Sequence, residues 1–500
     1  MVDAESVTKD GTAAVEDILE FVRVQARPDL VFSHQGGRGA AAGAADPTPI
    51  RSVSSSPVPL DRGLSALLAD TPYPEVAADS AKQPRSRRLQ CLLQQAAGFQ
   101  RYEPGNAFNT HRAFPSAQCK FPSEVFLSVG EGTWYFDAAR HELRPVGNGA
   151  AAPDLWAAVD AGAPAVVIVL GRPGSLPGYY RELRWSLTLC EGGHLLGLTA
   201  QLARTLGFDA HVLTDFDDQA LLQRAGAEPG DQWLPVGLVA LDGADAALTR
   251  TDPEWPVDQD PVLRMDRHAW QEDAGPDAGT AGGLHPAVRP APHRVVASSR
   301  SWGDVLFERS SGRAPGGFTA SPELLPSTAV PELLDAISDA AAMDWGGLLG
   351  GAEPGILLHL AVERAAGIDD GIYAYDAMTG KLTQQQHGAR LAEVQQSFFY
   401  PQQVTRVDSC NVAIFGSINY AGILASHGPR ALRLAQIQLG ALMQAGALAC
   451  AASGLFLRPC RSFSPDGLGA LIGLGDQETV SYLCLAGKSR FADLLLDQRI

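Results

Sequence analysis

Two basic segments in the second half of the sequence have the residue types that bind an anion. The first is Arg309-Ser310-Ser311-Gly312-Arg313, and the second is Lys488-Ser489-Arg490, which follows the apolar stretch Tyr482-Leu483-Cys484-Leu485. Guanidinium groups offer paired donors to a phosphate, and an ammonium group adds a point charge. Ser311 adds a hydroxyl donor. Segments of this kind can bind an anion such as a phosphate group; the alternative is that they are surface charges with no ligand.

A third segment, Arg112-Ala113-Phe114-Pro115-Ser116-Ala117, lies in the first half of the chain. The small residues at its end allow backbone N–H groups to approach a flat ligand, where they can stabilise negative charge. The alternative is an ordinary loop ahead of the strand predicted at Val125-Phe126-Leu127.

Side chains that bind metals form no recognisable pattern. Glu191 and His194 are three residues apart on a predicted helix, as packing or capping residues are, and no third ligand is evident. Seven cysteines are scattered without CxxC spacing, which predicts reduced, buried thiols. We therefore expect no metal site.

The composition narrows the classes of function. The 500 residues carry a formal net charge of −17, and 45% are hydrophobic. An acidic surface repels nucleic acid, so no such partner is expected. No run of about 18 apolar residues is free of glycine, proline and charge, which predicts no membrane span. The first residues, Met1 to Glu5, lack the features of a signal peptide, so a cytoplasmic location is expected.

The elements that must position these segments occur twice. Gly132-Thr133-Trp134-Tyr135-Phe136-Asp137 and Gly371-Ile372-Tyr373-Ala374-Tyr375-Asp376 each predict a hairpin strand. Further along, Leu221 to Gly226 corresponds to Leu468 to Gly473 at an offset of 247, and the same offset pairs Phe216 with Phe463. A long apolar helix is predicted before each, at about 186–206 and 430–453, and apolar residues on nearly every face predict that both are buried.

Two repeats are too few for a solenoid, so the pattern favours a duplicated domain. We predict an N-terminal helix (near 13–26) and flexible segment over 1–60, and a first domain over 61–245. A linker rich in Pro, Asp, Gly and Ala follows at 246–298, and a second domain at 299–500.

The repeated elements and the three segments resemble the SagB-like branch of the nitroreductase superfamily, over roughly 85–245 and 300–492. The resemblance implies an α+β fold in which tandem nitroreductase-like domains form an intramolecular pseudo-dimer. It also implies flavin mononucleotide (FMN) as the cofactor. Members of the superfamily are dimers whose two flavin sites each draw on both subunits.

The resemblance assigns the three segments to one divided flavin site. The flavin phosphate would be held by Arg309, Ser310, Ser311, Arg313, Lys488 and Arg490, and the flavin ring would be lined by Arg112, Pro115, Ser116 and Ala117. The first-copy counterparts of the phosphate segments, Leu67 to Pro72 and Asp242 to Asp245, lack the basic residues. The second-copy counterpart of residues 112–117, near Glu353-Pro354-Gly355-Ile356, lacks the serine. Because these losses are complementary, we expect one flavin per chain, bound between the two copies.

The catalytic base is less well marked. The branch carries a Lys-Tyr pair before the long helix, implicated in removing a substrate proton. In this chain that register gives Tyr179-Tyr180, in which the lysine is lost, and His427 in the second copy. A histidine has a suitable pKa for a base, whereas the pKa of Tyr180 would have to be lowered. A structural role near a helix start is the alternative for His427, so the base stays open.

The activity implied by the resemblance is oxidation of azoline rings (thiazoline or oxazoline) to azoles in a peptide natural product such as a thiopeptide. The implied partners are a precursor peptide, a YcaO-type cyclodehydratase and a leader-peptide-binding protein. Two alternatives are open: an NAD(P)H-dependent nitro- or quinone reductase, and a flavin-free scaffold in a peptide-modifying complex.

Overall fold

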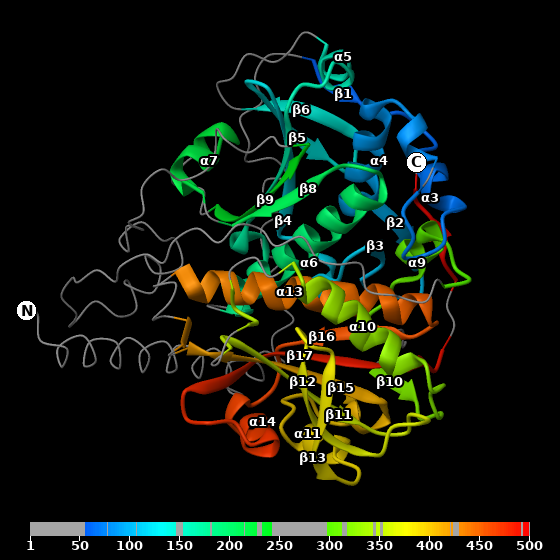
Figure 1. Cartoon of the computed structure of the whole chain (residues 1–500), viewed down its shortest axis with the longest axis vertical. Coiled ribbons are helices and arrows are strands. Elements are labelled where there is room, and N and C mark those ends of the chain that lie inside the picture. The colour runs from blue at the N-terminus through cyan, green and yellow to red at the C-terminus, as the bar shows by residue number, and fades with distance from the viewer. Residues whose placement is uncertain are drawn as a thin grey trace, which may run out of the picture.

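The computed structural model describes residues 56–499 except for 78, 107, 147–153, 181–182, 215, 228–232, 243–297, 313–317, 344–346, 351–353, 421, 424–429 and 492–493. Within this part the protein is α+β, with two lobes on either side of a pair of long helices, α6 and α13 (Figure 1). The helix predicted near 13–26 and almost all of the predicted linker at 246–298 lie outside the described residues.

The first lobe is built around a seven-stranded antiparallel sheet with the order β1-β6-β5-β4-β7-β9-β8. Its helices and strands are β1 (Val58–Pro59), α3 (Ala66–Ala69), α4 (Arg85–Ala97), β2 (Phe99–Tyr102), β3 (Thr110–Arg112), β4 (Ser123–Val129), β5 (Gly132–Asp137), β6 (Glu142–Val146), α5 (Leu155–Asp160), β7 (Ala165–Gly171), α6 (Leu183–Thr205), β8 (Ala210–Leu213), α7 (Asp218–Arg224) and β9 (Leu234–Leu241). Short 3-10 helices lie at Ser80–Lys82, Ala117–Cys119, Pro173–Ser175 and Gly178–Tyr180.

The second lobe has a sheet with the order β13-β12-β11-β15-β17-β10-β14, and β16 also pairs with β17. Its elements are α9 (Trp302–Glu308), β10 (Phe318–Ser321), α10 (Ala329–Ala341), β11 (Ile356–Val362), β12 (Gly371–Asp376), β13 (Lys381–His387), α11 (Leu391–Gln396), β14 (Thr405–Arg406), a 3-10 helix (Val407–Ser409), β15 (Val412–Asn419), α13 (Arg430–Ala452), β16 (Phe456–Cys460), α14 (Pro465–Ile472), β17 (Glu478–Ser489) and β18 (Leu496–Asp497).

The duplication predicted from the sequence is confirmed element by element. Helices α6 and α13 begin and end at the offset that relates the sequence repeats, and α7 and α14 begin at the same offset. The central strands even share an irregularity: the register shifts between Val169 and Leu170 where β7 pairs with β9, and between Gly416 and Ser417 where β15 pairs with β17. The two lobes are therefore two copies of one fold.

The lobes meet where α6 crosses α13, and glycine makes this crossing close. A Cβ on Gly193 would lie 2.0 Å from the carbonyl oxygen of Ile437, and a Cβ on Gly440 would lie 2.0 Å from that of Cys190. Both helices are buried along almost their whole length, as their all-round apolar pattern predicts. Among the described helices α13 is long and apolar enough to cross a membrane, but protein encloses all of it.

Gly193→Ala is expected to destabilise the protein by about 1–3 kcal/mol or more, because backbone atoms of α13 occupy the place of the new methyl group. The two helices must then separate along their contact. Urea unfolding measures the loss. Gly174→Ala is the matched control, since a Cβ on Gly174 would meet no atom within 4 Å. Equal stability of the two variants would contradict the close crossing.

Both ends of the second copy, α9 at its start and β18 at its end, pack against the first lobe. Strand β18 pairs with β2, with Leu496 opposite Tyr102, and so completes a three-stranded sheet with β3. Helix α9 lies against α3, where the Trp302 N–H donates to the carbonyl of Thr71 at 2.8 Å and its ring meets Tyr73 edge-on at 4.7 Å. This packing carries Arg309, the residue after α9, to the boundary between the lobes.

All seven cysteines are free, and the prediction of buried thiols holds for Cys91, Cys190, Cys410, Cys450 and Cys484. Cys119 and Cys460 are only partly buried. In the part of the chain that the structure describes, no group of three or more His, Cys, Asp or Glu side chains is arranged to hold a metal ion.

Candidate functional site

The segment Arg309 to Gly312, which we call the phosphate turn, is tied to the second lobe. The Oγ of Ser310 accepts the Gly312 N–H at 3.1 Å, and the Ser310 carbonyl accepts the Leu457 N–H of β16 at 3.1 Å. The side chain of Arg309 is 2% exposed and donates from Nη1 to the Oγ of Ser311 at 3.4 Å. A second guanidinium, from Arg458, donates to the Ser311 carbonyl at 3.1 Å. Two cations and two hydroxyl groups thus surround one tight turn.

Gly312 is required by that turn. Its φ is +86°, in the left-handed region, and a Cβ would lie 2.3 Å from the ring of Phe318. The Arg458 guanidinium covers the other part of that ring at 4.7 Å from its centre. Arg313, the second arginine predicted for the phosphate, lies outside the described residues.

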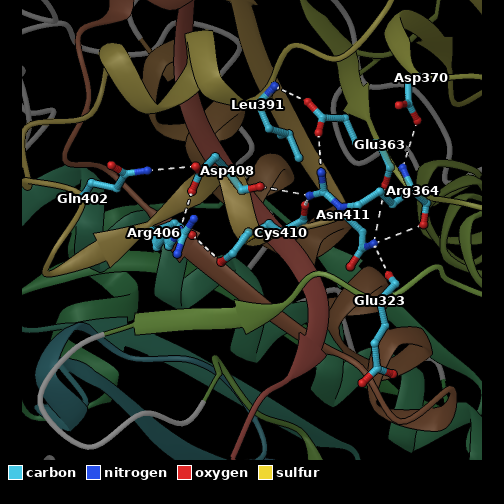
Figure 2. A network of polar contacts seen from close by, with 11 residues as sticks. Glu323, Glu363, Arg364, Asp370, Leu391, Gln402, Arg406, Asp408, Cys410 and Asn411 are labelled. Carbon is cyan, nitrogen blue, oxygen red and sulfur yellow. Dashed lines mark hydrogen bonds and ion pairs between the residues drawn. The ribbon is translucent and has the colours of Figure 1, made fainter.

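The other predicted phosphate residues, Lys488 and Arg490, lie at the exposed end of β17. A network of polar contacts around Asn411 anchors this end (Figure 2). The Asn411 N–H donates to the carbonyl of Ala486 at 3.0 Å, and its side-chain amide donates to the carbonyl of Glu323 at 2.9 Å. The Glu323 carboxylate in turn accepts from the Lys488 ammonium at 2.5 Å. Lys488 is therefore paired with Glu323, and this pairing holds the pKa of Glu323 below its usual range.

Residues 112–117, which we call the ring segment, follow β3 of the first lobe. The Arg112 guanidinium is buried between the rings of Phe99 and Phe121, at 5.2 and 4.6 Å from their centres. Its Nε is buried without a hydrogen-bond partner among the described residues. Pro115 is buried, whereas Ser116 and Ala117 are partly exposed. The Oγ of Ser116 accepts the Phe121 N–H at 2.8 Å, which closes the turn after the segment.

Contacts between the lobes connect the ring segment with the phosphate turn. Gln444 of α13 donates to the carbonyl of Ala113 at 3.0 Å and contacts the Nδ1 of His194 at 3.1 Å. The Nε2 of His194 lies 2.8 Å from the hydroxyl of Tyr482. Burial, opposed by the hydrogen bond with Gln444 and reinforced by the charge of Arg309, lowers the pKa of His194 to about 3. Arg309 of the second copy therefore lies near the helix that packs beside the ring segment of the first.

A charged cluster of the three-stranded sheet borders the same place. Arg101 and Glu103 form a fully buried ion pair, with Nε and Oε1 2.8 Å apart, and Arg101 also donates to the carbonyl of Phe307 in α9. The Nε2 of His111 lies 3.3 Å from the Glu103 carboxylate. Burial lowers the pKa of His111, and the charges of Arg101 and Arg309 add to that effect, while Glu103 opposes it. The three side chains meet where β2 pairs with β3, with Arg101 opposite His111.

A second set of contacts between the lobes is an ion pair that joins α13 of the second copy to α7 of the first. Arg433 in the first turns of α13 donates two hydrogen bonds to Asp218 of α7, at 2.7 and 3.1 Å. Arg430 lies 3.8 Å from the same carboxylate and covers the ring of Phe216. The position of α6 that matches Arg433 in the duplication holds the much smaller Ser186. Ser186 accepts from Arg461, the residue after β16, at 3.2 Å.

In its structure the chain is similar to a protein from Anabaena variabilis assigned as a nitroreductase. The TM-score is 0.64 and the identity 19%, over 92% of this chain and 96% of that one. The chain has the nitroreductase fold. The Anabaena protein matches both lobes within one chain.

Two further solved structures each match 42% of this chain. One is a protein from Ralstonia eutropha assigned as a nitroreductase, with 17% identity, 98% of that chain covered and a TM-score of 0.31. The other is from the Escherichia coli microcin synthetase McbBCD complex with truncated pro-MccB17 bound, with 14% identity, 79% of that chain covered and a TM-score of 0.29. Identities this low show the fold alone. No family model and no curated protein matches the sequence.

Within the nitroreductase fold, one counterpart drawn from the sequence is displaced. Ser123 opens β4 and Ile356 opens β11, so Gly355 corresponds to Pro122 rather than to a residue of the ring segment. The second-copy counterpart of the ring segment falls a few residues earlier, around Leu348 to Gly350, and it has no serine either. The prediction that the second copy lacks this half-site is unchanged. The residues assigned as its counterpart were wrong, because the loops before β4 and β11 differ between the copies.

The residues predicted for proton transfer are only partly described. Tyr180 ends the 3-10 helix before α6 and is partly buried. The side chain of Tyr179 and all of His427 lie outside the described residues. These assignments stay predictions.

Glu191 joins α6 to the start of β4, a contact that its spacing from His194 in the sequence does not indicate. It lies inside α6, so it caps nothing, and its side chain is 4% exposed. Its Oε1 accepts the Ser123 N–H at 3.1 Å, and the hydroxyl of Ser116 in the ring segment is close enough to favour the charged carboxylate. Burial outweighs these bonds and the nearby Arg112, and raises the pKa of Glu191 to about 7. Sequence spacing alone cannot separate such a carboxyl from a packing residue.

Glu191→Gln is expected to change how stability depends on pH. The carboxyl has a pKa of about 7 in the folded protein and 4.5 in the unfolded chain, so the folded state binds more protons between these values. Its contribution to stability is complete below about pH 4.5 and is lost as the pH rises through about 7, on the order of 3 kcal/mol. The amide does not titrate. Urea unfolding should therefore show the variant gaining stability relative to the wild type between about pH 5 and about pH 8; parallel profiles would contradict the burial argument.

Proposed function

We propose that this chain is an FMN-dependent dehydrogenase that oxidises thiazoline or oxazoline rings of a peptide to azoles. The observation that carries the proposal is that the ring segment of the first copy and Arg309 of the second copy lie close to the same histidine, His194, between the lobes. Gln444 binds the ring segment of the first copy at Ala113, and Arg309 of the second copy acts on the His194 beside it. The resemblance to SagB-like proteins supplies the choice of substrate.

The residues at this interface fit the cofactor. The flavin phosphate would be held by Arg309 with the hydroxyl groups of Ser310 and Ser311, and Arg458 adds a second, partly buried cation beside them. Arg313, Lys488 and Arg490 complete the proposed set, and Lys488 would have to exchange Glu323 for the phosphate. The ring would lie against Arg112, Pro115, Ser116 and Ala117. The buried Nε of Arg112, which has no partner among the described residues, is a donor still to be satisfied.

When bound, FMN would supply the hydride acceptor for the ring carbon of the azoline. The chain supplies position and proton transfer. The Arg112 guanidinium, held between two aromatic rings, adds positive charge where a reduced ring would carry negative charge. Tyr180, Tyr179 and His427 are the proposed candidates for the base that removes the proton from the ring carbon. Molecular oxygen is the proposed final electron acceptor.

We further propose one flavin per chain. Where α13 meets α7, Arg433 and Arg430 face Asp218 between the lobes. The first-copy sequence has no basic counterpart of the phosphate turn, and Asp242, directly after β9, pairs with Arg85 at 3.0 Å. A carboxylate at this position repels a phosphate group. A single chain would thus form its site without a second copy, in a pseudo-dimeric monomer.

The visible spectrum of the purified protein tests the cofactor. We expect flavin absorbance and a flavin-to-chain ratio near one. A colourless protein would instead favour the flavin-free scaffold.

The substrate is tested by incubating the protein in air with a synthetic azoline peptide, and with the product of a YcaO-type cyclodehydratase acting on a precursor peptide with its leader-peptide-binding protein. Loss of two hydrogen atoms from the peptide, measured by mass spectrometry, is the expected result. Rapid oxidation of NADPH with a nitro compound or a quinone, without azoline oxidation, would favour the reductase instead.

A further inference from the structure

The carboxyl group of Glu191 lies directly behind the ring segment. Its Oε1 accepts the Ser123 N–H, and its Oε2 is buried without a hydrogen-bond partner among the described residues. The hydroxyl of Ser116 in the ring segment is close enough to lower the pKa of this carboxyl, and it accepts the Phe121 N–H of the turn that follows the segment. Glu191 therefore lies next to the residues proposed to line the flavin ring.

The turn that Glu191 supports is strained. Gln118, Cys119 and Phe121 have φ values of +52°, +52° and +47°, in a region that residues other than glycine seldom adopt. Such conformations persist only where the surroundings enforce them, and they gather at functional sites. The charged and titratable groups that face Glu191 are Arg112 from β3 and Cys119 from this turn. Burial raises the pKa of Cys119 to about 11, so the thiol brings no charge at neutral pH.

The duplication provides an internal comparison. Gln438 occupies in α13 the position that Glu191 occupies in α6, and it is also buried. The nitroreductase fold therefore accepts an uncharged amide at this place. The ionisable carboxyl stands only in the copy whose ring segment has kept its arginine and serine.

We propose that Glu191 takes up a proton from solvent when the flavin at the ring segment is reduced, and returns it on reoxidation; this inference rests on the proposed function. A hydride from the azoline brings two electrons and one proton to the ring, which gains one negative charge. The Glu191 carboxylate binds one proton from water and becomes a neutral acid. The pocket then holds the same net charge before and after the transfer.

The driving force is electrostatic. A carboxylate and a negatively charged ring repel one another strongly at a buried place, where the effective dielectric constant is low. Arg112 faces both groups and can balance only one of them. Because the folded protein already holds the pKa of Glu191 at about 7, a modest additional repulsion is enough to protonate it at neutral pH.

The test is the reduction potential of bound flavin as a function of pH, measured with a reference dye during dithionite titration. In the wild type the potential should fall more steeply than in Glu191→Gln over the pH range in which the carboxyl titrates. One additional proton for two electrons adds about 30 mV per pH unit. Asp137→Asn is the matched control, since that carboxyl is also buried but pairs with Arg144 on the sheet of the first lobe. The control should follow the wild type.

A second measurement does not depend on any variant. Reduction of the wild type in weakly buffered indicator solution above neutral pH should take up more than one proton per flavin. Parallel potential profiles of the wild type and Glu191→Gln, or an uptake of one proton alone, would overturn the inference. Proton linkage without azoline oxidation would support it and reject only the proposed substrate. A protein that binds no flavin would reject both.

Discussion

Replacing Arg309 and Arg313 by alanine is expected to give a protein that is purified without flavin. Hydrogen bonds to charged groups contribute about 1.5–3 kcal/mol each. Loss of two such contacts weakens binding roughly 100- to 10,000-fold. Arg309 should account for much of this loss, because its guanidinium is 2% exposed and acts with little screening by solvent. The flavin-to-chain ratio after gel filtration, and titration of the apoprotein with FMN, measure the effect.

The control for this variant is Arg224→Ala. Arg224 is another partly buried arginine, which donates to the Oγ of Ser128 at 2.8 Å in the first lobe, away from the phosphate turn. It should keep its flavin. Because Arg309 is buried, the melting temperature of each variant separates lost binding from lost folding. A double variant that keeps its full flavin content would remove the phosphate assignment.

Much of the fold could be predicted because the duplication repeats its local patterns. Apolar residues on all faces of two long segments predict two buried helices, and these are α6 and α13. The aromatic strands that begin at Gly132 and Gly371 are β5 and β12. The packing of the ends of the second copy against the first lobe could not be predicted in this way. Strand β18 is very short and pairs with Tyr102 in the other half of the sequence, so no local periodicity marks it.

The candidate site shows the same division between local and long-range information. The phosphate turn and the ring segment are continuous in sequence, so their residue types could be read directly. Gln444, Arg458 and Glu191 act through contacts between distant elements, and each looks like an ordinary residue of a helix or strand. Glu191 in particular has the spacing of a packing residue, and only its burial against Ser123 and Ser116 distinguishes it.

Asp218→Ala is expected to cause the largest loss of stability, about 3–5 kcal/mol. The Arg433 side chain is 1% exposed, and Asp218 accepts two of its hydrogen bonds while also facing Arg430. Removing the carboxylate leaves two guanidinium groups in a buried interface without this counter-charge. Replacing both members of a buried ion pair with hydrophobic residues of similar size, by contrast, changes the free energy of unfolding little. The double variant Asp218→Leu with Arg433→Met should therefore recover much of the loss. Urea unfolding gives both values.

The comparison that separates burial from charge is Asp79→Ala. Asp79 pairs with Lys82 at 2.5 Å, but the two side chains are 85% and 77% exposed, so solvent screens the pair and its loss should change the free energy of unfolding far less than the loss of Asp218. Because Asp218 is not among the residues proposed to hold the flavin, the Asp218→Ala protein that remains folded should keep a flavin-to-chain ratio near one. Unchanged stability of Asp218→Ala would mean that water screens this ion pair despite its burial.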